Sequence, residues 1–504
     1  MRAAAPTPLE VRLEFPEGAA PLPQHPLLKA AHPGPAEIVH LNTRYFDTES
    51  LDLWAQGMTL FVQETAGDYV QALQPVRLDA GFGTPPRGWE WRVEAAEPEP
   101  LLLEEAGADL DLANIGPLRP VFSTRVVRTV CSVLPEAGTT VEMVADEGDI
   151  DTGDRQESLR QWRLVLKNGP PAPLYALASA LLADLPTRLG VECTAMRGYR
   201  LLTGASAQPR KAKTIPLTPE LSATEAFRRI ILGAIADLLE NQPAAAAGNA
   251  EGVHQMRVAV RYLRTALTLF GPFLEPHVVS GFVAALRELG RMLGVARDWD
   301  VFCTETLASA FEESQFHYKY LLEQAAAAKQ AEAYRAAIAE FEGKRISGLV
   351  LGLSAWVFDD DQLSRHASMR QPLQHVAPDL QDRLARKSAK RGQHLARREV
   401  AELHALRKSI KKLRYGAAYL SGLYPGNKTR RYLKACKRLQ KLLGQLNDAN
   451  TATALAETLH SENQNELIPA VGELAAWSSG RRSEALHALP RAWKKFRRRA
   501  PFWH

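Results

Sequence analysis

The chain lacks long apolar segments. In its 504 residues no hydrophobic run approaches the ~20 residues that a membrane-spanning helix needs, and its N-terminus carries no apolar stretch typical of a secretory signal. Cysteine is also scarce: the four cysteines, at positions 131, 193, 303 and 436, form no C-x-x-C pair. This spacing excludes a disulfide framework and a cysteine zinc cluster. We therefore expect a cytoplasmic protein with no membrane partner, in which the cysteines are small buried side chains.

The net charge of +5 conceals an asymmetry between the two halves of the chain. Residues 1–210 hold 18 Lys and Arg against 28 Asp and Glu, whereas residues 211–504 hold 44 against 29. An acidic half and a basic half attract different partners, so we expect two domains with different electrostatic roles. A short stretch of small residues with a basic centre is typical of a linker between them. The predicted boundaries are 1–207 for the first domain, 208–217 for the linker and 218–504 for the second.

The first half has the pattern of a β-rich domain. Short apolar or alternating runs separated by turn residues predict strands. These runs are 9–15, 58–63, 69–74, 89–93, 139–145 and 160–167. A helix is expected over 173–185. Several antiparallel strands with polar residues alternating on one face suit a closed, tunnel-like barrel with a polar interior.

The second half has the apolar periodicity of helices. The predicted helices are 217–242, 252–270, 276–293, 299–311, 312–341, 378–399, 400–423, 428–443, 448–461 and 472–496. The first is expected to begin with Thr218 as its N-cap and Pro219 as its first residue. We predict an α+β protein of two domains, in which an antiparallel β-barrel with helices precedes an all-α pair of four-helix bundles related by a pseudo-twofold axis.

A cassette of one histidine and three cations occurs twice, 150 positions apart, with the pattern H-x2-R-x3-[R/K]-x2-R. The copies are His254, Arg257, Arg261 and Arg264, and His404, Arg407, Lys411 and Arg414. An aspartate follows each histidine after 44 positions, and two further cations align in the segments between. These are Asp298, Arg287 and Arg291 in the first copy, and Asp448, Lys437 and Lys441 in the second. A fixed offset of this kind indicates a duplicated structural unit, with repeats at about 218–362 and 363–504.

Helical geometry places each cassette on one surface. At 100° per residue, the four cassette positions fall within an arc of about 80° on one face of a helix. Like charges at this spacing destabilise an isolated helix. Two copies in register therefore indicate an anionic ligand, and arginine forks match phosphate oxygens. The alternative for a single cassette is a solvated basic face that nearby acidic residues neutralise.

The histidines and aspartates allow several roles. No HExxH or similar ligand spacing surrounds His254 or His404, so we expect no metal site and interpret both as phosphate hydrogen-bond donors. A bound polyanion would promote their protonation. Asp298 and Asp448 could cap the next helix, fix the orientation of an arginine or take part in metal binding, for which a single carboxylate per site is weak evidence. We expect no cofactor.

The second half, from about 217 to 504, resembles the CHAD family, the conserved histidine α-helical domain. The motifs that carry the resemblance are the two cassettes and the segments from Leu293 to Asp300 and from Leu443 to Asn450. The resemblance implies paired four-helix bundles around a basic groove that binds inorganic polyphosphate, in proteins that associate with polyphosphate granules. The second copy departs from the pattern at Asn447 and Asn450, where the first has Arg297 and Asp300.

The first half resembles the CYTH, or triphosphate-tunnel, family, which often precedes CHAD. The segments that carry the resemblance are Tyr45 to Thr48, Ser123 to Arg128, Asp146 to Gly148, Leu166 to Gly169 and Arg197 to Tyr199. The family's opening E-x-E-x-K is replaced by Glu10, Arg12 and Glu14, and its later acidic strand by Gln161, Arg163 and Val165. The arginine pair and the lysine of the next two strands fall on residues 60–63 and on Gln74.

These departures remove most of the chemistry that triphosphate hydrolysis requires. That reaction needs carboxylates for a divalent metal and cations for the phosphate oxygens. Arg163 places a cation near the expected metal position, and only Arg125, Arg128, Lys167 and Arg197 remain of the cations. We therefore predict that the tunnel domain is not an enzyme and acts as a scaffold, a module for a protein partner or a modulator of the helical half.

Three functions compete on this basis. The sequence favours a non-enzymatic polyphosphate-binding protein at polyphosphate granules. The alternatives are a metal-dependent inorganic triphosphatase and a nucleic-acid-binding protein. The basic C-terminal segment, residues 491–499, supports the nucleic-acid alternative, although the chain has no helix-turn-helix, zinc-finger or RNA-binding aromatic motif.

Overall fold

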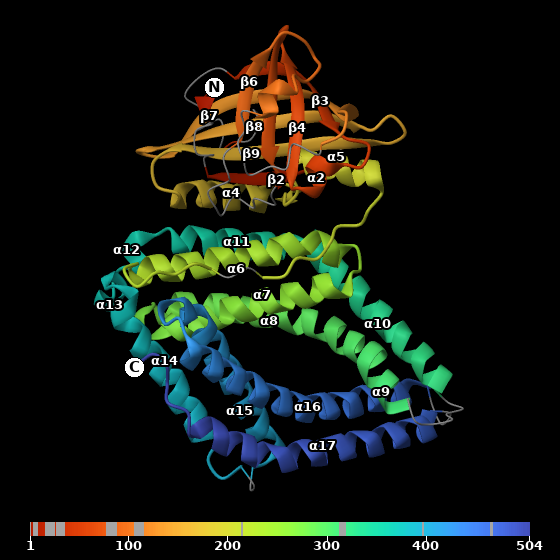
Figure 1. Ribbon diagram of the computed structural model, residues 1–504, viewed down its shortest axis with the longest axis vertical. Helices are drawn as coiled ribbons and strands as arrows, with labels where there is room; N and C mark the ends of the chain where they lie inside the picture. The colour runs from red at the N-terminus through yellow and green to blue at the C-terminus, as the bar shows by residue number, and fades with distance from the viewer. Residues whose placement is uncertain are drawn as a thin grey trace. The chain divides into compact units, whose positions relative to one another are not determined.

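A computed structural model of the chain describes residues 2–3, 9–15, 26, 36–76, 88–104, 115–212, 215–311, 319–395, 398–463 and 467–504. These residues form two compact units (Figure 1). The first unit comprises Met1–Pro209, Leu239–Ala247 and Glu340–Asp359. The second comprises Arg210–Leu238, Gly248–Ala339 and Asp360–His504. Residues 81–86, the Gly- and Pro-rich turn residues between two of the predicted strand runs, lie outside the described residues. No helix in the described part of the chain is long and apolar enough to cross a bilayer.

The first unit is built on one antiparallel sheet with the strand order β1-β6-β5-β4-β3-β7-β8-β9-β2-β10. The strands are β1 (Arg2–Ala3), β2 (Glu10–Glu14), β3 (Glu37–Asp47), β4 (Met58–Thr65), β5 (Asp68–Pro75), β6 (Trp89–Val93), β7 (Arg119–Glu136), β8 (Thr139–Asp151), β9 (Gln156–Asn168) and β10 (Arg188–Leu189). Each predicted run falls on one of these strands. Among the described residues no pairing joins the edge strands β1 and β10, so the closed barrel of the prediction is an open sheet there.

The register of the sheet gathers charged residues on one face. Arg12 of β2 pairs directly with Arg163 of β9, and Gln161 of β9 pairs with Asp146 of β8. Asp146 in turn pairs with Arg128 of β7. Paired residues of neighbouring strands point to the same side. The residues between them in sequence, such as Val11 and Leu13 of β2, are buried on the other side.

Helices cover part of this sheet. The short helices α2 (Asp52–Ala55) and α3 (Leu101–Glu104) lie in connections, whereas α4 (Ala172–Asp184) contacts β2, β7 and β9, and α5 (Thr194–Thr203) contacts β7, β8 and β9. Helix α11 (Lys344–Val357) also belongs to this unit and packs on α4. The ring of Tyr175 in α4 stacks on Phe358, just beyond α11, with centroids 5.6 Å apart.

The second unit is helical. Its main helices are α6 (Ala223–Ala246), α7 (Ala250–Phe270), α8 (Pro276–Val301), α9 (Leu307–Phe311), α10 (Lys319–Glu342), α14 (Leu373–Arg391), α15 (Val400–Tyr419), α16 (Asn427–Asn463) and α17 (Ile468–Arg497), and the ends of α6 and α10 extend into the first unit. Short helices α12 (Asp360–Leu363) and α13 (Ala367–Arg370) precede α14, 3-10 turns η3 (Gly271–Phe273) and η6 (Leu420–Leu423) follow α7 and α15, and a π-helical turn η4 (Phe302–Thr306) joins α8 to α9.

Several helix boundaries differ from the prediction, and three of them show the effect of tertiary contacts. The first helix begins at Ala223 and not at Pro219, because residues 221–223 pair with residues 371–373. Helix α8 runs through residue 294 and α16 through Gly444, where breaks between helices were expected. Tertiary packing therefore overrides the weak helix propensity of glycine at both positions.

A short antiparallel β-bridge joins the two repeats. The amide of Ala223 donates to the carbonyl of Gln371 at 2.9 Å, and the amide of Leu373 donates to the carbonyl of Leu221 at 2.7 Å. Each donor has its counterpart 150 positions away in the other bond. Reciprocal bonds between equivalent residues are what a twofold relation between the repeats produces.

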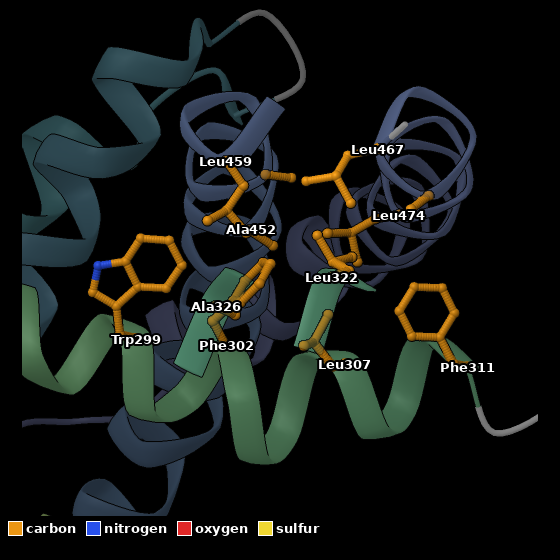
Figure 2. Close-up of a cluster of buried hydrophobic side chains, with 12 residues drawn as sticks. Trp299, Phe302, Leu307, Phe311, Leu322, Ala326, Ala452, Leu459, Leu467 and Leu474 are labelled. Carbon is orange, nitrogen blue, oxygen red and sulfur yellow. The ribbon is translucent and has the colours of Figure 1, made fainter. Parts of the chain in front are cut away.

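A shared core joins the ends of the repeats (Figure 2). The first repeat contributes Trp299, Phe302, Leu307, Phe311, Leu322 and Ala326, and the second contributes Ala452, Ala456, Leu459, Leu467, Ala470 and Leu474. Phe302 and Ala452 have a second role, because both also line the pocket described next. Packing of this core therefore fixes the floor of that pocket.

Candidate anion-binding site

The cassette helices α7 and α15 begin with caps at equivalent positions. The Asn249 side chain accepts hydrogen bonds from the amides of Glu251 and Gly252 at 2.9 and 3.0 Å. Exactly 150 positions later, Glu399 and Glu402 form a reciprocal capping box at the start of α15. Such caps fix where a helix starts and therefore which way its side chains point. Both cassettes consequently begin in the same helical phase.

The cassettes meet in one pocket of about 430 Å³. Its charged and imidazole side chains are His254, Arg257, Arg261, Arg297 and Asp298 from the first repeat, and His404, Arg407, Lys411 and Asp448 from the second. Five of these are permanent or potential cations of Lys or Arg type, and two are carboxylates. The pocket therefore has an excess of positive charge, and its floor is apolar.

The aspartates hold arginines in place. Arg257 Nη1 lies 3.1 Å from Asp298 Oδ1, and Arg407 Nη2 lies 3.8 Å from Asp448 Oδ1. Both aspartates are inside continuous helices, so the capping role considered for them is wrong. The second role considered, orientation of an arginine, agrees with these contacts. Among the described residues no group of three or more His, Cys, Asp or Glu side chains could hold a metal ion.

Arg261 and Lys411 occupy equivalent positions of the two cassettes, and neither has an ion-pair partner within 4.0 Å among the described residues. Burial and the neighbouring Arg407, Arg261 and Arg257 lower the pKa of Lys411 to about 7. Burial lowers the pKa of Arg261 as well, although a guanidinium keeps its charge at any physiological pH. These two side chains are the pocket's uncompensated cations, and their charge favours an anion between them.

The histidines lie in the same pocket and are easily kept neutral. Burial and the charge of Arg297 lower the pKa of His254, and burial and Lys408 lower that of His404. His404 Nδ1 lies 3.0 Å from Asn447 Oδ1, which fixes the orientation of the ring. The negative charge of a polyanion in the pocket would offset these neighbouring cations and so raise the pKa of both histidines. The role of both histidines as hydrogen-bond donors to a bound anion stays a prediction.

The repeats are not equivalent where the sequence departs from the duplication. Arg297 lies 3.3 Å from Glu305 and 3.9 Å from the buried Asp300. Its counterpart Asn447 is uncharged and forms a hydrogen bond with His404. The second repeat therefore contributes less positive charge to the pocket at this position. Arg297 was not predicted as a site residue, although its place beside Asp298 was a signal that could have identified it.

The remaining predicted site residues do not line the pocket. They are Arg264, Arg287, Arg291, Arg414, Lys437 and Lys441. Of these, Arg287, Arg291, Lys437 and Lys441 are exposed on their helices. Arg287 is close enough to Arg264 to lower its pKa, after the larger effect of burial. The Arg414 guanidinium lies 4.4 Å from the centroid of the Tyr415 ring, which Arg261 also faces at 4.9 Å. These cations form a wider basic surface on the cassette helices and their neighbours, without entering the pocket.

In the first unit the cations have partners within the chain. Arg163 lies 3.4 Å from both Glu10 and Asp146, and Arg128 donates to Asp146 at 2.6 Å. Asp146 is only 2% exposed, and attraction by Arg163 and Arg128 outweighs burial and lowers its pKa. The other cations that remain from the tunnel family's pattern also form ion pairs. Arg125 pairs with Asp151, Lys167 with Glu142, and Arg197 with Glu157.

Two segments that carry the tunnel resemblance stabilise the fold. The fully buried Asp47 carboxylate accepts hydrogen bonds from the amides of Leu53 and Trp54 and from the Tyr199 hydroxyl, at 2.8–3.0 Å. A Cβ on Gly198 would lie 2.1 Å from the Phe122 ring, so the close packing there requires glycine. Glu10 and Asp146, the carboxylates beside Arg163 near the tunnel family's metal position, do not fit a metal site, because both already pair with Arg163.

Comparison with known proteins places the pocket in a known family. The model of the CHAD domain matches residues 229–457, which include both cassettes and both aspartates. Two uncharacterised proteins of Mycobacterium tuberculosis strains are 27% identical over 405 residues, covering 75% of this chain and 75% of each relative.

Solved structures with similarity to the chain include the CHAD domain of Ricinus communis, at 28% identity and a TM-score of 0.49, covering 57% of this chain and 96% of that one. PptA from Streptomyces chartreusis is 15% identical with a TM-score of 0.42, covering 54% and 100%. A candidate adenylyl cyclase from Hippeastrum, described as having a dominant triphosphatase activity, is 16% identical with a TM-score of 0.27, covering 39% and 95%. On the family match, residues 229–457 of this chain form a CHAD domain.

Proposed function

We propose that the protein binds inorganic polyphosphate in the pocket between the two cassettes and associates with polyphosphate granules in the cytoplasm. The observation that carries the proposal is the position of Arg261 and Lys411, which face one pocket from two repeats without a carboxylate partner among the described residues. A linear polyanion supplies several phosphates in succession. It would neutralise these central cations and extend over the exposed cations of the wider basic surface.

The pocket fits phosphate better than nucleic acid. Proteins that bind single strands combine cations with exposed aromatic rings on which bases stack. The aromatic residue that lines this pocket, Phe302, is 1% exposed and packed in the shared core, so its ring face is not available. Phosphate recognition requires only the cations and hydrogen-bond donors that line the pocket.

Retention on immobilised long-chain polyphosphate tests the proposal. We expect binding at low salt that weakens steeply as salt rises, because neutralised phosphates release their counter-ions. Competition by soluble polyphosphate and by single-stranded DNA at equal charge separates the two kinds of ligand. Failure of polyphosphate to retain the protein at low salt, or preferential displacement by DNA, would overturn the proposal.

The first unit is proposed to be inactive as a triphosphatase. The support is that Arg163 pairs with the carboxylates nearest the expected metal position and that the remaining cations pair within the chain. The test is phosphate release from tripolyphosphate with Mg²⁺ or Mn²⁺, compared with a variant that carries Arg128→Ala and Lys167→Ala. Release by the unaltered protein above that of the variant would show that the unit is an enzyme. A protein partner for this unit stays a prediction.

A further inference from the structure

A second pocket lies beside the cationic one, on the second repeat only. It has a volume of about 610 Å³ and is formed by the start of α15, the middle of α16 and Arg482 of α17. His404, Arg407, Asn447, Thr451 and Leu455 line both pockets and so form their shared wall. The two spaces are therefore adjacent.

The two pockets differ in chemistry. The second is lined mainly by aliphatic side chains, namely Val400, Ala401, Leu403, Leu443, Leu446, Ala454 and Leu455. Its polar lining consists of His404, Arg407, Asn447, Asn450, Thr451 and Arg482, with no carboxylate and no Phe, Tyr or Trp. An apolar space with cations along one side suits a ligand that has an aliphatic part and an anionic end.

Packing shows why the space is in the second repeat. Helices α10 and α17 have the same order of buried residues. In α10 these are Leu322, Ala326, Ala337 and Phe341, and in α17 they are Ala470, Leu474, Ala485 and Leu489. The spacing of these buried residues is identical in the two helices. Aligning the helices on them makes Gln330 equivalent to Ser478 and Tyr334 equivalent to Arg482.

In the first repeat these positions complete a polar network. Gln330 Nε2 donates to Asp300 Oδ1 at 2.8 Å, and the Tyr334 hydroxyl lies 2.9 Å from Asp300 Oδ2. In the second repeat Asn450 replaces Asp300, and it lines the second pocket together with Arg482. The short Ser478 side chain is 4% exposed, and its hydroxyl has no hydrogen-bond partner among the described residues. The glutamine that helps to fill this place in the first repeat is thus replaced by a shorter serine in the second.

We propose that the second pocket binds the aliphatic group of a soluble phosphate monoester, whose phosphate lies at the shared wall near His404, Arg407 and Arg482. The phosphate end rests on the proposed anion-binding function of the first pocket. The aliphatic end is independent of it, because it depends on the apolar lining. The site therefore discriminates an organic phosphate from inorganic phosphate of the same charge.

A series of alkyl phosphates from methyl to hexyl tests the proposal by calorimetry on the full chain, at concentrations below micelle formation. We expect affinity to rise with each added methylene, up to roughly fourfold for one that is fully buried. Inorganic tripolyphosphate is the parallel probe. If tripolyphosphate binds and affinity shows no dependence on alkyl length, the second pocket is not a ligand site and the proposed function survives. If alkyl length matters while no tripolyphosphate binds, the anion-binding function fails instead.

A pair of variants locates the effect. Ala454 is an exposed residue of the lining, and Ala454→Trp should fill the pocket and abolish the dependence on alkyl length, with tripolyphosphate binding retained. Its counterpart in the first repeat is the exposed Thr304, so Thr304→Trp is the matched control and should keep the dependence. An unchanged alkyl series in Ala454→Trp would overturn the proposal. Binding to phosphatidic-acid vesicles that Ala454→Trp abolishes, without binding of hexyl phosphate, would also overturn it by assigning the pocket to a membrane lipid.

Discussion

The two units of this protein use arginine in opposite ways. In the first unit Arg163 and Arg128 neutralise Asp146 inside the sheet, and the neighbouring cations pair with carboxylates of the same unit. In the second unit two repeats bring Arg261 and Lys411 to one pocket without an ion-pair partner among the described residues. A cation whose charge is satisfied within the chain stabilises a fold. A cation that two converging helices bring into a pocket without a carboxylate partner can attract an anionic ligand.

The comparison also shows how the partners of an arginine change what it can do. Placing arginine between carboxylates removes the electrostatic reason for a metal to bind there, since the pair already compensates both charges. The cassettes lack such compensation at their centre, although Asp298 and Asp448 orient one arginine each. The balance of carboxylates to cations thus differs between the two groups.

The largest effect is expected in the first unit. Asp146→Asn removes the negative charge with which Arg128 and Arg163 both pair. The two partly buried guanidinium groups then lose this ion-pair partner. We expect the free energy of unfolding of this unit to fall by about 3 kcal/mol. Hydrogen exchange of β8 and β9 in the full chain measures it. Lys167→Ala breaks a more exposed pair and should cost less than about 1 kcal/mol. Equal losses in the two variants would contradict the claim that Asp146 is the centre of the network.

A slightly smaller effect is expected in the pocket. Arg261→Gln together with Lys411→Gln removes the two uncompensated cations while keeping side chains of similar length. We expect polyphosphate affinity to fall about a hundredfold, with a shallower dependence on salt, because two charge-assisted contacts are lost. The control is Lys494→Gln with Lys495→Gln, which removes the same charge from exposed positions of α17. A similar loss in the control would mean that net charge, and not the pocket, determines binding.

The pH dependence of polyphosphate binding tests the contribution of Lys411. Its pKa is lowered from 10.5 to about 7 in the folded protein, so between these values the unfolded chain holds a proton that the free folded protein does not. Stability without ligand therefore rises as pH increases through this window. A bound polyanion favours the protonated amine, so affinity should fall by about tenfold between pH 7 and pH 8.5. The histidines, whose pKa values are lowered too, add a further gain in affinity below pH 6.5.

The matched variant for that experiment is Lys411→Arg, which installs the residue found at the equivalent position of the first repeat. Its guanidinium stays charged, so the decline of affinity between pH 7 and pH 8.5 should disappear. Fluorescence titration at fixed ionic strength measures both proteins. A decline that persists in Lys411→Arg would assign the pH dependence to another group.

The smallest effect is expected at the exposed cations outside the pocket. Lys437→Gln with Lys441→Gln should weaken binding of long polyphosphate by about threefold and leave short tripolyphosphate unaffected, because screened surface charges contribute little. Competition binding with the two chain lengths measures this. A loss as large as that of the pocket variant would extend the site over the whole basic surface.

Much of the fold could be predicted from periodicity. The strand runs and the helical second half are where the alternation and the 3.6-residue pattern placed them. Continuity of α8 and α16 could not be predicted, because glycine at 294 and Gly444 signals a break and only packing against neighbouring helices compensates for it. The sheet was predicted to close, but closure depends on pairing between strands far apart in the sequence. The domain boundaries remain a prediction.

The sequence alone determined that two cation cassettes exist, that each occupies one helix face and that they are copies of one unit. These are local properties, fixed by residue spacing and the helical repeat. Only the tertiary structure decided which cations share a pocket, because Arg264 and Arg414 have the same spacing as their neighbours yet lie outside it. It also decided that Asp298 and Asp448 orient arginines and that Arg163 is neutralised. Those outcomes depend on distances between segments far apart in the chain, and on the burial that makes an unpaired charge costly.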